Sequence, residues 1–230
     1  MKDKILTVQP AINATADHIE LARLSRKLGI PVPIVHIQVK STRAGAITGF
    51  YEGLSRTWTR NYWNILFASL CGLPTVATNF GAGYLSMKQV GGTVSAYTTP
   101  QNLTQSPVGP INNSAYGIIP GRGSTAENFD SYALATPITH GVSATQLSFR
   151  ASSHSSAYTS ETKLWTATIS RLFDNLSGGS IVITESAIYA YFATMGWSLM
   201  NCRDLLASSV TVLDDGVLTI KYTITLTFPN

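Results

Sequence analysis

The most regular pattern in the chain lies near its C-terminal end. From Leu218 to Phe228, apolar side chains alternate with threonine and lysine, and the polar positions are mostly β-branched. A period of two places alternate side chains on opposite faces of a strand, and β-branched residues favour that conformation. The pattern therefore predicts a half-buried antiparallel strand that closes the chain.

Two long hairpins are predicted around this strand. Residues 209–213 precede it, and Asp214-Asp215-Gly216 between the two segments is typical of a hairpin turn. Upstream, residues 165–173 alternate in the same way, Ser177-Gly178-Gly179 predicts another turn, and residues 181–192 return. With the shorter segments before them, these hairpins predict a mainly β fold, an antiparallel β-sandwich or jelly-roll-like domain.

The first part of the chain has a different pattern. Apolar residues recur at helical spacing between a Thr15 or Asp17 cap and the stop signals Gly29 and Pro31. A short strand is predicted over residues 34–39, and a second helix from Arg60 to Cys71 behind the cap Thr59. We therefore expect an N-terminal helical and extended docking arm over residues 1–74, followed by an antiparallel β-domain over residues 75–230. Deletion of residues 1–40 is expected to leave that β-domain folded.

Composition narrows the class of protein. With 44% hydrophobic residues the chain is not a disordered tail, and 12% charged residues argue against a coiled coil. The net charge is +4, and residues 1–62 hold nine Lys and Arg against four Asp and Glu. Arg23, Arg26 and Lys27 form the basic end of the first predicted helix. Because no run of basic residues is longer than the pair Arg26-Lys27, solvated side chains are favoured over a nucleic-acid contact.

The sequence favours a soluble protein without a membrane span. The longest apolar segment, Tyr62 to Leu73, is broken by polar residues and too short to cross a bilayer. No signal peptide is expected at the N-terminus. Cys71 and Cys202 stand in apolar surroundings, where isolated thiols behave as small buried side chains.

No motif points to catalysis, a metal or a cofactor. The four histidines lack zinc-like spacing, and Gly121-Arg122-Gly123-Ser124-Thr125 lacks the spacing of a phosphate loop. No serine stands in a nucleophile elbow. We therefore expect a protein that is not an enzyme and uses no cofactor.

Glu185 is the most informative charged residue. Strict alternation places it on the same face as Ile181 and Ile183, and a carboxylate buried there needs partners. Either Arg171 or Arg203 can supply a charge, which makes these three residues a candidate structural anchor. The alternative is a catalytic acid, but the paired carboxylate of a glycosidase is missing nearby. The anchor is the favoured interpretation.

An ordered series of short motifs provides a further indication. Over about residues 55–230 the chain resembles structural proteins of tailed-bacteriophage virions. The resemblance is carried by residues 55–62, 117–125, 129–134, 137–141, 146–149, 169–175, 177–179, 183–185, 202–206, 210–212 and 215–216. It implies a subunit of the tail, the neck or collar, or the head accessory structures, made in the host cytoplasm and found in the virion. It implies a homo-oligomer bound to other phage virion proteins, and no catalytic residues.

A second hypothesis remains beside the structural subunit. Ten tyrosines, four tryptophans and the Ser/Tyr-rich segment Ser152–Tyr158 also suit a receptor- or carbohydrate-binding module of a phage tail or fibre, with a host surface glycan as ligand. A hydrolase acting on a cell-surface polymer is the third hypothesis, and no paired carboxylates favour it. The sequence does not give the copy number, symmetry or position on the particle.

Overall fold

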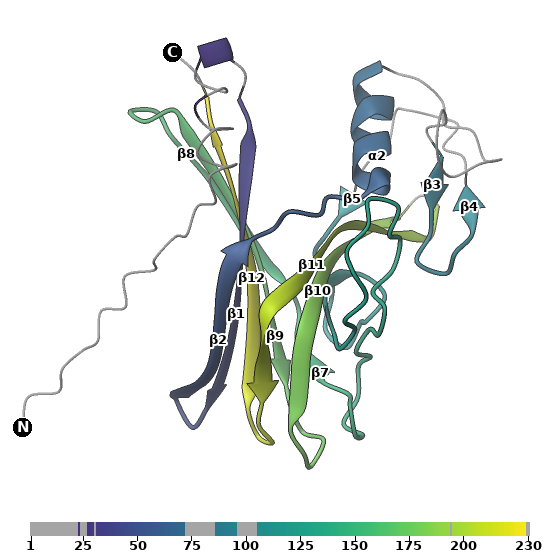
Figure 1. Cartoon of the computed structure of the whole chain (residues 1–230), viewed down its shortest axis with the longest axis vertical. Helices are drawn as coiled ribbons and strands as arrows, with labels where there is room; N and C mark the ends of the chain where they lie inside the picture. Colours follow the sequence, from purple (N-terminus) through teal and green to yellow (C-terminus); the bar gives the residue numbers. More distant parts are fainter. Residues whose placement is uncertain are drawn as a thin grey trace, which may run out of the picture.

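The computed structural model describes residues 23, 27–29, 31–71, 86–95, 105–193 and 195–228 (Figure 1). Within these residues the fold is mainly β, with antiparallel strands in two packed sheets and the helix α2 (Arg60–Cys71). The expected fold class and the second predicted helix are confirmed. The first predicted helix and Arg26 fall mostly outside the described residues.

The larger sheet, sheet A, is built around the C-terminal strand. Its strands lie in the order β2, β1, β12, β9 and β7, with β8 also paired to β9. They are β2 (Ala46–Leu54), β1 (Pro33–Arg43), β12 (Val217–Thr227), β9 (Leu164–Asp174), β7 (Ser148–Phe149) and β8 (Ser153–Thr159). The alternation predicted for β12 is confirmed, because Leu218, Ile220 and Tyr222 are fully buried on one face.

The smaller sheet, sheet B, packs against sheet A. It contains β11 (Trp197–Val212), β10 (Ile181–Phe192), β6 (Gly117–Gly121) and β5 (Gln105–Ser106), with both β6 and β5 paired to β10. A separate two-stranded hairpin joins β3 (Met87–Lys88) to β4 (Val94–Ser95). Helix α2 contacts β11 and β3, and in Figure 1 it stands beside the upper ends of β10 and β11.

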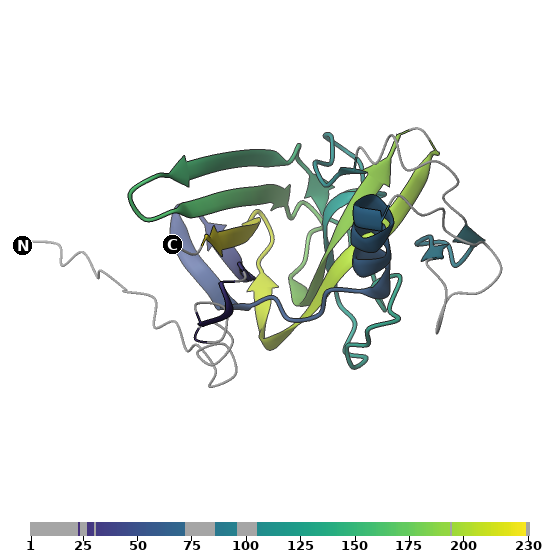
Figure 2. The ribbon, with the colours of Figure 1, turned by 90° about the horizontal axis from the view of Figure 1, so that it is seen from above.

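The main core lies between the two sheets. Its buried side chains come from both sheets, including Ile37 and Val39 of β1 and Ile183 of β10. Sheets A and B lie close together at the end where the chain passes from one sheet to the other. The two sheets diverge toward the opposite end (Figure 1). Seen from above, β8 and β9 reach away from β10 and β11 (Figure 2). Part of sheet A therefore projects beyond the sandwich.

The sequence analysis predicted two hairpins, and this prediction is wrong because the strands of each predicted hairpin lie in different sheets. β9 lies in sheet A and β10 in sheet B, while β11 pairs with β10, and β12 pairs with β1 and β9. The turn motifs are crossovers between the sheets, and Asn175 joins them. Its side-chain amide donates to the carbonyls of Gly179 (2.7 Å), Val212 (2.9 Å) and Leu213 (3.1 Å). Satisfying these carbonyls stabilises both crossovers without a hairpin ladder.

The boundary expected at residue 74 also needs correction. β1 pairs with β12 from Pro33 opposite Leu226 to Thr42 opposite Val217, and β2 pairs with the other side of β1. Residues 33–54 therefore belong to the β-domain and not to a separate arm. A deletion of residues 1–40 removes most of β1, so the expectation that it spares folding no longer holds.

Candidate functional site

Glu185 and Arg203 form a buried ion pair on neighbouring strands of sheet B. Their side chains are 0% and 3% exposed, and Arg203 Nη2 lies 2.8 Å from Glu185 Oε2. The β10–β11 register shifts between Ile183 and Glu185, which interrupts the alternation that the sequence suggested. As a result Ser186 reaches Tyr222 of sheet A, and Glu185 lies on the opposite face. The face predicted for Glu185 is therefore wrong.

This ion pair holds the segment 121–136 against sheet B. Glu185 Oε1 accepts the backbone N–H groups of Gly123 and Thr136, both at 2.9 Å. Arg203 Nη2 donates to the carbonyl of Thr125 at 2.7 Å, and Nη1 donates to that of Ala126 at 3.3 Å. Because both charges are paired and bound to backbone groups, the pair meets the requirement for burying ions.

The glycines of the sequence motif allow this close approach. A Cβ atom on Gly121 would lie 2.6 Å from Glu185 Oε1, and one on Gly123 would lie 2.4 Å from the same atom. Either contact is too short for a real side chain. Their place in the motif thus reflects space for the carboxylate and not a phosphate loop.

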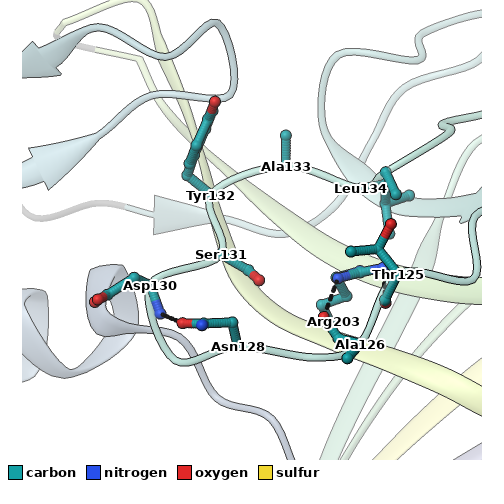
Figure 3. A pocket seen from close by; sticks show the side chains of 10 residues that line it. Thr125, Ala126, Asn128, Asp130, Ser131, Tyr132, Ala133, Leu134 and Arg203 are labelled. Atoms are coloured by element: carbon teal, nitrogen blue, oxygen red, sulfur yellow. Dashed lines mark hydrogen bonds between the residues drawn. The ribbon is translucent and has the colours of Figure 1, made fainter.

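The same segment surrounds a hollow of about 530 Å³ that is open to solvent. Figure 3 shows the chain curving around this hollow, with Arg203 on one side of it. Besides Thr125 and Arg203, the polar side chains that line it are Asn128, Asp130, Ser131 and Tyr132. Arg60 of α2 forms an ion pair with Asp130, and Lys88 Nζ lies 3.8 Å from the centre of the Tyr132 ring. The hollow combines an aromatic ring with hydroxyl, amide and carboxylate groups.

Arg171 lies apart from this pair and forms a second anchor. Its fully buried guanidinium donates five hydrogen bonds to backbone carbonyls, those of Pro110, Asn113, Tyr116, Ile118 and Arg150, at 2.6–3.3 Å. It also lies 4.8 Å from the centre of the Phe149 ring. Burial lowers its pKa to about 10, so it stays charged at neutral pH. Of the two arginines considered for Glu185, the structure pairs it with Arg203.

Asp204 is a buried carboxyl that the sequence reasoning missed. It follows Arg203 in β11 and therefore faces the opposite side, toward Ser55 and Tyr222. Its Oδ1 accepts the N–H of Arg56 at 3.1 Å. Burial, with a smaller effect of nearby Glu127, raises the pKa of this carboxyl to about 7 against the lowering effect of the hydrogen bonds from Ser55 and Arg56. In the sequence, Asp204 lies between Cys202 and the pair Leu205-Leu206, and an aspartate flanked by such residues in a strand was the available signal for this site.

A polar cluster surrounds Asp204 in the core. Burial raises the pKa values of the Cys202 thiol and the Tyr222 hydroxyl well above their ordinary ranges. Tyr222 also donates to Ser186 Oγ at 3.1 Å. Cys202 and Tyr222 are therefore neutral at physiological pH, and burial disfavours the charged form of Asp204.

Arg23 and Lys27 are exposed, and Arg26 lies outside the described residues. Across the described ranges, no three His, Cys, Asp or Glu side chains are grouped so as to hold a metal ion. Nor does that part of the chain contain a helix long and apolar enough to span a membrane.

Comparisons of the chain with family models, curated proteins and solved structures find no match.

Proposed function

We propose that the chain is a non-enzymatic structural subunit of a tailed-phage virion, located in the tail, the neck or collar, or among the head accessory proteins. In this proposal it works as a homo-oligomer that docks onto other virion proteins. The N-terminal docking arm is now limited to about residues 1–31, since β1 begins at Pro33. Arg23, Arg26 and Lys27 supply its basic side chains.

The observation that carries this proposal is the use of the motif residues as anchors. Glu185 and Arg203 bind the segment 121–136, and Arg171 binds the segment 110–118, in each case through backbone groups. Asn175 joins the two crossovers. The motifs on which the resemblance to virion proteins rests thus contribute to rigidity, which suits a subunit that carries load within an assembly.

Purified phage particles provide the direct test. An antibody against the recombinant protein should label one position on particles in electron microscopy, and quantitative mass spectrometry should give a fixed copy number per particle. Protein that accumulates in infected cells but is missing from particles purified through two density gradients would contradict the proposal.

The hollow around segment 121–136 favours a second candidate, the receptor- or carbohydrate-binding module. Sugars bind to surfaces that combine an aromatic face with hydrogen-bonding side chains, and Tyr132 lies beside Asn128 and Asp130 here. A glycan array tests this candidate. Saturable binding that is lost in Tyr132→Ala and kept in the control Phe50→Ala, an exposed aromatic residue on β2, would support it. Absence of binding on the array would count against it.

A further inference from the structure

Strand β8 leaves one edge of sheet A open. All seven of its residues, Ser153 to Thr159, are exposed, and it pairs with β9 on one side. Among the described residues no strand pairs with its other side. In Figures 1 and 2 the β8–β9 hairpin reaches out from the sandwich, away from sheet B.

An open edge of this kind attracts another strand. Its unpaired N–H and C=O groups form a template, and proteins usually block such edges with lysine, proline or a bulge. β8 reads Ser-His-Ser-Ser-Ala-Tyr-Thr, which contains neither lysine nor proline, and its register with β9 is regular. The opposite edge strand, β2, differs because β11 packs against it. A Cβ atom on Gly49 would lie 3.1 Å from Val210.

We propose that β8 pairs antiparallel with β8 of a second copy of this chain, around a twofold axis at Ser156. In that register Ser156 faces its own counterpart, and His154 faces Tyr158 of the second copy. Sheet A then continues from one subunit into the next. The proposal rests on the homo-oligomer of the proposed function and specifies which surface forms it.

A second copy fits this edge for two reasons. Antiparallel pairing is self-complementary, so one strand supplies both halves of a twofold interface. The strand also carries no formal charge when His154 is neutral, so two copies meet without repulsion between like charges.

An apolar row beside the edge also favours this pairing. Tyr158 lies opposite Trp165 of β9, and Trp165 lies opposite Leu226 of β12, so the three share one face of sheet A. Tyr158 is 56% exposed and contacts Phe228, which is 40% exposed. His154 of a second copy would lie beside Tyr158 and extend this row, removing part of its apolar surface from water.

Charge substitutions at the axis test the proposal on the full chain. Ser156→Lys places two lysines opposite each other in a homodimer, and Ser156→Asp places two aspartates there. We expect the unmodified protein to show, by light scattering, the mass of a dimer or of an assembly of dimers. Each variant alone should show half that mass or weaken association at least tenfold. An equimolar mixture of the two variants should regain association, because lysine then faces aspartate.

Ser180→Lys provides the matched control. Ser180 is an exposed serine in the crossover before β10, and this substitution should leave the mass unchanged.

The outcomes separate this inference from the proposed function. An oligomer whose mass is the same in all three variants would overturn the β8 interface and leave a homo-oligomeric subunit standing. A protein that is monomeric up to high micromolar concentration would also overturn the β8 interface. The open edge of β8 would then be available to a strand of a different protein. Loss of association in each variant without recovery in the mixture would overturn the twofold register at Ser156.

Discussion

At the residue scale, Asp204 makes stability depend on pH. Its pKa is about 7 in the folded protein against an ordinary value of 3.8, so the native state binds more protons than the unfolded chain between these values. Linkage then requires the free energy of unfolding to fall as pH rises from about 4 to 7. The difference of about three pKa units corresponds to a loss on the order of 4 kcal/mol.

Asp204→Asn tests this dependence. Asparagine retains an acceptor for the Arg56 N–H and cannot ionise, so the variant should lose the Asp204 component of the pH dependence. Urea unfolding at pH 5 and pH 8 measures it, and the variant should be the more stable protein at pH 8. The control Glu161→Gln changes an exposed carboxylate in the β8–β9 turn and should keep the pH dependence of the original protein. A variant with the same slope as the original would show that another group is responsible.

The Glu185–Arg203 pair allows a second prediction at this scale. Glu185→Gln leaves the Arg203 guanidinium buried without a counter-charge, which typically costs about 3–5 kcal/mol. Hydrogen exchange should increase first at the amides of Gly123 and Thr136, which lose their charged acceptor. Equal exchange across all strands, without an early increase in this segment, would contradict the local role of the pair.

At the scale of elements, Asn175 stabilises the two crossovers that connect sheet A with sheet B. Asn175→Ala removes three hydrogen bonds to carbonyls of both crossovers, and burying unsatisfied groups costs about 1–3 kcal/mol each. We therefore expect a fall in the midpoint of thermal unfolding of several degrees. The exposed Asn128, which accepts a single N–H, provides the control Asn128→Ala and should change the midpoint by less than about one degree. A similar shift in both variants would argue against the special role of Asn175.

The strands themselves could be predicted from the sequence, but their partners could not. Period-two alternation identified β12 and β9, because each places one face in the core. The turn motifs around Gly178 and Asp215 look like hairpin turns, since local sequence does not distinguish a hairpin from a crossover between packed sheets. The distinction depends on Asn175, whose three acceptors come from segments 4 to 38 residues away.

The candidate site was predictable in the same partial way. A lone carboxylate in an apolar strand indicated that Glu185 needs a partner, and two arginines were available. Which arginine it binds depends on the irregularity between Ile183 and Glu185, which turns the side chain to the other face of sheet B. Asp204 is adjacent to Arg203 in the sequence, but adjacent residues in a strand face opposite sides, so its burial in the core depends on which side of β11 faces sheet A.

At the scale of the whole molecule, the place of β1 sets the limit of the docking arm. A chain that begins at residue 32 keeps all of β1, so we expect it to fold with the thermal midpoint of the full chain within a few degrees. A chain that begins at residue 41 loses eight of the ten residue pairs between β1 and β12, from Pro33 to Lys40, and opens the centre of sheet A. It should be insoluble or unfolded by circular dichroism.

The shorter deletion then separates folding from assembly. If residues 1–31 dock the subunit, the folded chain that begins at residue 32 should be missing from purified particles when it replaces the full-length protein during infection. The variant with Arg23, Arg26 and Lys27 changed to Ser keeps the length of the arm and removes its basic groups. Reduced incorporation of this variant would assign docking to charge, whereas normal incorporation would assign it to the apolar residues of the arm. Normal incorporation of the folded deletion would show that the β-domain docks without the arm.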